Sequence, residues 1–347
     1  MLALFLGFTT AFAITYAIIP VIIKVAKERR LYDRPNERSS HQEPTPSLGG
    51  IGIFAGMVCG IVLWTPEGSF SVLQYILAAF VLIFLIGILD DLLPISPGKK
   101  LGGQFLVAII LSYKAGVKVS SLYGFWGIYE LSAPISFVLS IILIVGIINA
   151  FNLIDGINGL AGCVGLLTCL VFGICFFWVE ASALAVVSFS LAGAILAFLR
   201  YNFTPAKIFM GDTGSLLLGT LCAILAISFI EINNKLPPES PYNWGAAPAI
   251  AVAVLILPLY DTFSVLIRRI VRGRSPFSPD KTHIHHQLLG LGLSHSETTG
   301  VLIAVNLLFI ALAFGFSRYG LFKVLTLEFA LAFFFSLILI LLPRLKK

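Results

Sequence analysis

Long apolar runs recur along almost the whole 347-residue chain, and they limit its possible folds more than any other feature. Two of them, residues 134–148 and 160–179, flank a short polar stretch. Only 12% of the residues are charged, whereas soluble globular proteins have about 25%. A helix needs roughly 17–25 mainly apolar residues to cross a bilayer. We therefore expect an all-α polytopic integral membrane protein.

The apolar runs predict about eleven transmembrane helices within a single domain, residues 1–347. Residues 117–131 combine β-forming residues with a glycine-containing turn, and we expect a small external β-hairpin there. The predicted spans are residues 2–24, 48–65, 72–93, 101–114, 133–150, 158–179, 182–200, 211–231, 246–268, 298–317 and 322–342.

The basic residues predict the orientation, because cytoplasmic loops of membrane proteins are rich in Lys and Arg. Most of the 23 Lys and Arg residues fall in alternate loops, beginning with the loop after the first span. We therefore expect the N-terminus outside and the C-terminus in the cytoplasm. The net charge of +6 is attributed to loops that face anionic lipid, and no nucleic-acid partner is expected.

Polar clusters occur at the predicted cytoplasmic ends of the spans, and the first is Asp90-Asp91. Adjacent carboxylates repel each other, so a nearby cation is the simplest way to keep both ionised. A solvated helix end is the alternative, although a helix C-terminus is the unfavourable pole for negative charge. The pair therefore indicates a Mg²⁺ site or acid–base chemistry, and Lys99 and Lys100 nearby are suited to neutralising a phosphate.

The second cluster, residues 149–159, supplies amide oxygens from three asparagines and a carboxylate from Asp155. If this segment is helical, Asn152, Asp155 and Gly159 share one face. Oxygen-only ligands suit Mg²⁺. The alternative is a simple Asn/Asp/Gly turn between two helices.

The third cluster, residues 209–215, opens a predicted span with the sequence Phe-Met-Gly-Asp-Thr-Gly-Ser. Asp212 fits a helix N-cap. The same geometry presents backbone N–H groups to a phosphate, with Asp212 free to hold its metal. Both interpretations stay open from the sequence.

The fourth cluster contains His283, His285 and His286 close to the arginines of residues 268–274. Zinc is disfavoured, because no cysteine is nearby and residues 283 and 285 would diverge on a helix. Histidines beside arginines suit diphosphate recognition better, with a solvated basic loop as the alternative. Asp261, in the ninth predicted span, has no assigned role.

Acids, amides and basic residues thus gather at one membrane face, as in a magnesium-assisted phosphoryl-transfer site. The number of spans implies that one substrate is a lipid. An ion or metabolite transporter is the rival class, but it would carry acids through the whole membrane depth. Here the acids lie at one edge, with Asp261 deeper.

The motifs together resemble the polyprenyl-phosphate N-acetylhexosamine-1-phosphate transferase family, in its WecA/TagO branch. The matching segments are Asp90-Asp91 and residues 44–50, 149–161, 209–215 and 279–286. The resemblance implies transfer of N-acetylglucosamine-1-phosphate from UDP-GlcNAc to undecaprenyl phosphate, with release of UMP. It also implies Mg²⁺ (Mn²⁺ substituting) as cofactor, a bacterial cytoplasmic membrane with the site facing the cytoplasm, and a possible homodimer. Another UDP-HexNAc or UDP-MurNAc-pentapeptide is the alternative donor.

The resemblance also implies roles for individual residues. One departure is Asn158, where bacterial relatives usually have Asp and eukaryotic ones Asn, so a catalytic acid at 158 is excluded. Direct attack by the lipid phosphate and a covalent aspartyl-phosphate intermediate are the two mechanisms in question. The implied residues are Asp90, Asp91 and Asp155 for catalysis; Asp212, Asn152 and Asp91 for the metal; Lys100 and Asp90 for the lipid phosphate; and Asp155, Asn158, His283, His285, His286, Arg272 and Arg274 for the nucleotide sugar.

Overall fold

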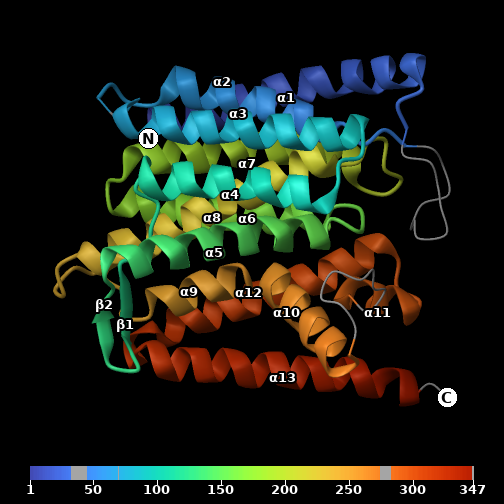
Figure 1. Ribbon diagram of the computed structural model, residues 1–347. Coiled ribbons are helices and arrows are strands. Elements are labelled where there is room, and N and C mark those ends of the chain that lie inside the picture. The colour runs from blue at the N-terminus through green and yellow to red at the C-terminus, as the bar shows by residue number, and fades with distance from the viewer. Residues whose placement is uncertain (33–44, 69, 274–282, 346–347) are drawn as a thin grey trace.

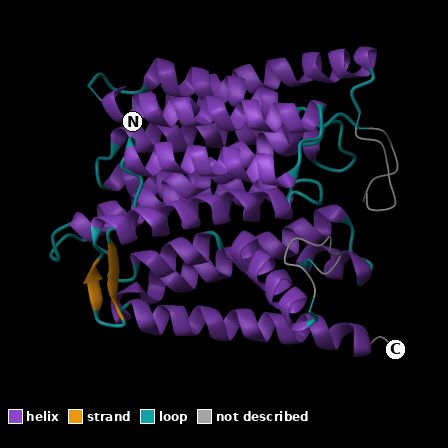
Figure 2. Cartoon of the chain, viewed as in Figure 1, coloured by secondary structure: helices purple, strands orange, loops and turns teal. Residues whose placement is uncertain are grey.

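The computed structural model describes residues 1–32, 45–68, 70–273 and 283–345, and long helices dominate it (Figures 1 and 2). Most helices pack side by side along one common direction, with a short hairpin at one end and α11 at the other (Figure 1). The elements are α1 (Leu2–Arg29), α2 (Gly49–Trp64), α3 (Phe70–Leu92), α4 (Pro97–Tyr113), β1 (Ser121–Phe125), β2 (Ile128–Glu130), α5 (Ala133–Ile154), α6 (Leu160–Trp178), α7 (Ser182–Asn202), α8 (Gly211–Lys235), α9 (Ala247–Val254), α10 (Ile256–Val271), α11 (Ile284–Gly290), α12 (His295–Phe316), the 3₁₀ turn η1 (Ser317–Tyr319) and α13 (Leu321–Leu345).

Among the described residues, eight helices are long and apolar enough to cross a membrane, or nine if the bent pair α9 and α10 counts as one span. Helices α2 and α4 are shorter, with 16 and 17 residues. The chain is therefore an all-α, multi-pass membrane protein. The count of eleven spans, the sidedness of the two termini and the external position of the hairpin stay predictions.

Helix α8 forms the centre of the bundle, and nearly all of its length is buried. Apolar residues occupy this helix on every side, as expected for a helix surrounded by others. Helices α2, α3, α5, α6 and α9 all pack against it. The N-terminus of α8 is therefore held by several neighbours at once, and this end carries Asp212.

The predicted span 246–268 is not one straight helix, because α9 and α10 are separate helices bent by 79°. Pro258 lies in the first turn of α10 and has no N–H to donate to the Val254 carbonyl, so a continuous helix would lose that bond. The Asn306 side chain compensates by donating to the carbonyls of Ala253 (2.9 Å) and Val254 (3.3 Å). The hydropathy pattern does not reveal such a break, since both halves are apolar.

The polar segment 149–159 is also not one helix. Helix α5 ends at Ile154, Asp155 leaves the helical conformation, and Gly159 has a φ of 82° before α6 begins. The Gly159 N–H donates to Asn202 Oδ1 at 2.8 Å, which ties the turn to the end of α7. Asn152 therefore lies on the last turn of α5, whereas Asp155 and Asn158 lie in the turn that follows.

Close backbone contacts hold the N-terminus of α8 against α2. The N–H groups of Gly49 and Gly50 donate to the carbonyls of Phe209 and Met210, each at 2.9 Å. A Cβ on Gly50 would lie 2.2 Å from the Gly214 nitrogen and 2.6 Å from its Cα. Only a residue without a side chain lets the two helices approach this closely.

We predict that Gly50→Ala destabilises the protein by about 1–3 kcal/mol, since the added methyl group meets backbone that has no room to move. The measurement is thermal unfolding of the purified protein in detergent. Gly146→Ala is the matched control, because no atom lies within 4 Å of a Cβ at that helical position. Equal unfolding temperatures for the two variants would contradict the close approach.

Candidate active site

An open cavity of about 700 Å³ lies among the helix ends that are close to α11. Most of the predicted site residues line it, from four separate parts of the chain. Lys100, Arg272, His283 and His285 are not among the described lining residues, and Arg274 lies outside the described part of the chain. The predicted residues that do line the cavity are Asp90, Asp91, Asn152, Asp155, Asn158, Asp212 and His286.

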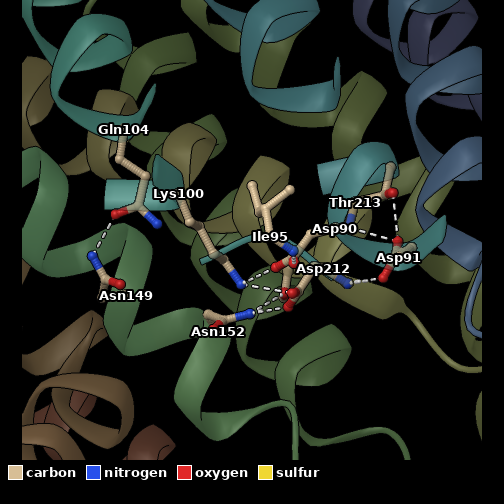
Figure 3. A network of polar contacts seen from close by, with 10 residues as sticks. Asp90, Asp91, Ile95, Lys100, Gln104, Asn149, Asn152, Asp212 and Thr213 are labelled. Atoms are coloured by element: carbon tan, nitrogen blue, oxygen red, sulfur yellow. Dashed lines mark hydrogen bonds and ion pairs between the residues drawn. The ribbon is translucent and has the colours of Figure 1, made fainter. Parts of the chain in front are cut away.

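Asp212 is the centre of the polar network shown in Figure 3. Its Oδ2 lies 2.6 Å from the Lys100 ammonium, and its Oδ1 accepts a 2.5 Å hydrogen bond from Asn152 Nδ2. Lys100 also contacts Asp90 Oδ2 at 3.0 Å, and the other Asp90 oxygen accepts from the Ile95 N–H. One ammonium thus bridges two carboxylates that are 122 positions apart in the sequence.

The charge of Lys100 is well supported by this arrangement. Lys100 lies directly before the predicted fourth span, residues 101–114. Burial lowers the pKa of Lys100, but the carboxylates of Asp212 and Asp90 outweigh this effect, so the net pKa is raised. The ammonium therefore stays protonated at any physiological pH.

Asp91 contacts the N-terminus of α8. Its Oδ1 accepts from the Asp212 N–H (2.7 Å), and its Oδ2 accepts from the N–H (2.9 Å) and hydroxyl (2.5 Å) of Thr213. A carboxylate at this pole is stabilised by the helix dipole. Two of the N–H groups expected to face a phosphate thus donate to Asp91. Asp212 is not the N-cap, because Met210 holds that position, without a side-chain capping hydrogen bond.

Asp155 and Asn158 behave differently within their shared turn. Asp155 makes no hydrogen bond or ion pair with the described residues, and burial raises the pKa of Asp155 well above its usual range, with Asp212 and Asp91 adding to the effect. Asn158 donates to the Thr204 hydroxyl at 3.2 Å, and its carbonyl accepts from Thr299 at 3.1 Å. Asp155 thus offers a carboxyl to the cavity, while Asn158 also anchors the turn.

Asp261, whose role the sequence left open, holds the histidine cluster. Its Oδ2 lies 2.8 Å from His283 Nδ1, and its Oδ1 accepts from the Ile284 N–H at 2.8 Å. His283 and His285 are buried, whereas half-buried His286 lines the cavity. The rings of His285 and His286 are 4.4 Å apart. His286 is therefore the member of the cluster that faces a ligand, and His283 and His285 pack behind it.

Sequence reasoning missed Asn202, which also lines the cavity. Besides accepting from Gly159, it donates to the Ile208 carbonyl at 2.9 Å. It thereby joins the turn before α6 to the loop before α8. The sequence does offer a signal for it: the apolar predicted span 182–200 is followed by Asn202, directly before the polar loop that leads to residue 209.

Known proteins resemble this chain over most of its length. The model of glycosyl transferase family 4 matches residues 73–230. A decaprenyl-phosphate N-acetylglucosaminephosphotransferase of Mycobacterium leprae is 34% identical over 334 residues, covering 88% of this chain and 81% of its own. The chain belongs to glycosyl transferase family 4.

Two further relatives of this family 4 member have similar coverage. One is the undecaprenyl-phosphate alpha-N-acetylglucosaminyl 1-phosphate transferase of Escherichia coli, 33% identical with 90% of this chain and 84% of its own covered. The other is a probable undecaprenyl-phosphate N-acetylglucosaminyl 1-phosphate transferase of Bacillus subtilis, 32% identical with 89% and 84% covered. The family resemblance inferred from the motifs is therefore confirmed.

The pH dependence of stability provides a test of the histidine cluster. Burial lowers the pKa of His285 to about 3, with Asp261 opposing and the neighbouring histidines adding to the shift. The unfolded chain binds this proton near pH 6.5, so between about pH 6.5 and 3 the unfolded state holds more protons. Stability contributed by neutral His285 is therefore lost as the pH falls through this range.

We predict that the unfolding temperature in detergent falls between pH 7 and pH 4, and that His285→Gln reduces this fall. The substitution removes the buried imidazole that resists protonation, while keeping a polar side chain of similar size. His286→Gln is the control, because His286 is only half-buried. An unchanged pH slope in His285→Gln would show that the imidazole is not held in its neutral form.

Proposed function

We propose that this protein transfers N-acetylglucosamine-1-phosphate from UDP-GlcNAc to undecaprenyl phosphate and releases UMP. The observation that carries the proposal is the Asp90–Lys100–Asp212–Asn152 network beside a polar cavity in a bundle of membrane-spanning helices. The names of the relatives support the same reaction. The reaction takes place on the cytoplasmic side of a bacterial cytoplasmic membrane, as the first membrane step of a cell-envelope glycan pathway.

Lys100 is the residue proposed to bind the lipid phosphate, because its ammonium lies between Asp90 and Asp212 at the end of the helices. A phosphate monoester has its second pKa near 6, so the lipid phosphate is largely dianionic without a strong base. One of its oxygens attacks the β-phosphorus of UDP-GlcNAc in line with the leaving group. The new P–O bond forms as the bond to the UMP oxygen breaks. Asp90 orients the attacking phosphate or accepts its remaining proton.

Mg²⁺ is the proposed cofactor, and the test of its fit is the chemistry of the side chains. Asp212 and Asn152 supply only oxygen as metal donors, which is the type that Mg²⁺ prefers. Among the described residues, no group of three or more His, Cys, Asp or Glu is arranged to hold a metal, so the ion would share its coordination with substrate phosphate and water. Bound there, Mg²⁺ would neutralise phosphate charge.

Asp91, which the resemblance implies as a further metal ligand, is also proposed to act as a positioning residue. Three hydrogen bonds from Asp212 and Thr213 already occupy both of its oxygens. Its contribution is to fix the backbone of Asp212, and thereby the carboxylate that faces Lys100.

The nucleotide sugar is proposed to bind on the side of the turn 155–159. Asp155, Asn158 and His286 line the cavity there. His283 and His285 support His286 from behind, and Asp261 fixes the start of α11. Arg272, exposed at the end of α10, is retained as a diphosphate contact. Another UDP-HexNAc is the alternative donor.

The direct test is UMP release by purified protein with undecaprenyl phosphate, Mg²⁺ and a panel of UDP-sugars. UDP-GlcNAc is expected to give the fastest release, and none is expected without the lipid. Absence of release with every UDP-HexNAc would overturn the proposed function. Exchange of labelled UMP into UDP-GlcNAc in the absence of lipid would replace direct attack by a covalent intermediate.

We predict that Asp212→Asn lowers kcat by at least about 100-fold, the range seen when one electrostatic contact of an active site is removed. The amide keeps the size of the side chain but loses the charge that pairs with Lys100 and binds the metal. Glu67→Gln is the control, since Glu67 is exposed and does not line the cavity. Retention of wild-type turnover with normal thermal stability would remove Asp212 from the reaction.

A further inference from the structure

Arg30 adopts an unfavourable backbone conformation directly after α1. Its φ of 56° and ψ of 36° are left-handed, and its N–H donates back to the carbonyls of Ala26 and Lys27. Helices often end in this conformation, but the residue is usually Gly or Asn, because a Cβ is disfavoured there. A large side chain kept at such a position against backbone preference is a reason to look for its function.

The Arg30 side chain makes no hydrogen bond or ion pair with any of the described residues, so no such contact explains its presence. It is not needed to neutralise the end of α1 either, because Lys27 and Arg29 already lie in the last turn. A solvated arginine in the basic loop after the first span would explain the residue type, but not the left-handed backbone of Arg30.

Arg30 lines the same cavity as the proposed catalytic residues. Among the described residues that line this cavity it is the single Lys or Arg, and the same lining includes the side chains of Asp90, Asp91, Asp155 and Asp212. Lys100 is already bound to two of these acids. A substrate that brings a phosphate into so acidic a cavity needs a further cation, since like charges repel each other.

We propose that Arg30 is a phosphate-binding residue of this cavity. The guanidinium forms paired, charge-assisted hydrogen bonds to phosphate oxygens, a geometry that Lys does not reproduce. The phosphate belongs either to the nucleotide sugar or to the polyprenyl lipid. This role rests on the proposed function only in requiring that the cavity accept phosphorylated substrates. None of the four sequence clusters includes this residue.

The test uses Arg30→Gly, which removes the guanidinium and relieves the backbone at once. The KM of one substrate is expected to rise about tenfold or more, because a charge-assisted contact is lost. The unfolding temperature is expected to stay equal or to rise, because Gly adopts the left-handed conformation without a Cβ penalty. Arg30→Lys keeps the charge and should show a smaller rise in KM. Loss of affinity without loss of stability is a result that a merely structural role would not produce.

The matched control is Arg29→Ala, which removes the same charge one residue earlier from a side chain outside the cavity lining. It should leave both KM values unchanged. KM is measured separately for UDP-GlcNAc and for undecaprenyl phosphate, each with the other substrate saturating, and the KM that rises identifies the phosphate. Unchanged KM values in Arg30→Gly, or an equal rise in Arg29→Ala, would overturn the proposal.

Failure of the proposed function is distinguishable from failure of this proposal. If wild-type protein releases no UMP, equilibrium titration with UDP-GlcNAc and with undecaprenyl phosphate replaces the kinetic measurement. Weaker binding of either compound by Arg30→Gly than by Arg29→Ala would support the role of Arg30 in phosphate binding. Equal binding of both compounds by the two variants would overturn it.

Discussion

The contact between Asp91 and the N-terminus of α8 is the interaction on which the candidate site depends. The last turn of α3 is an unfavourable place for two carboxylates, because the C-terminal end of a helix dipole is negative. The carboxylate of Asp91, however, contacts the N-terminus of α8, where a helix dipole stabilises negative charge. This contact fixes the direction of the Asp212 side chain, which in turn meets Lys100 and Asn152. Asp91 thereby joins α3 to α8, and the Asp212 carboxylate joins α8 to Asn152 of α5 and Lys100 of α4.

A second constraint is that a membrane protein must supply hydrogen-bond partners for its own backbone N–H and C=O groups wherever a helix breaks. Three side chains supply such hydrogen bonds in or near the candidate site. Asn202 accepts from Gly159 at the turn before α6, Asn306 donates to two carbonyls at the break before α10, and Asp261 accepts from the first N–H of α11. These side chains provide the hydrogen bonds that the irregular backbone needs, and the irregular backbone lets Asp155, Asn158 and His286 line one cavity.

Much of this could be predicted from the sequence, because periodic apolar runs determine helices locally. Each run expected to span the membrane is helical, and the oxygen-bearing residues Asp90, Asn152 and Asp212 do converge. The break at Leu255 was not predictable from hydropathy, since both halves of the run are apolar and only Pro258 hints at it. The partners of Asp91 and Asp261 lie far away in sequence, so packing decides them. Arg30 was missed because its signal is a backbone angle, which no residue pattern displays.

Charge balance explains why these features belong together. Four aspartate side chains line the cavity, and the Lys100 ammonium neutralises part of the charge on two of them. A phosphorylated substrate would add negative charge to a site that already repels it, and the repulsion grows as water is excluded. Such a site becomes favourable only when cations accompany the phosphate. The oxygen donors of Asp212 and Asn152 suit a divalent ion, and the arginine at the end of α1 suits the phosphate itself. The acidity of the cavity thus argues that a cation accompanies the phosphate, which would bind poorly without it.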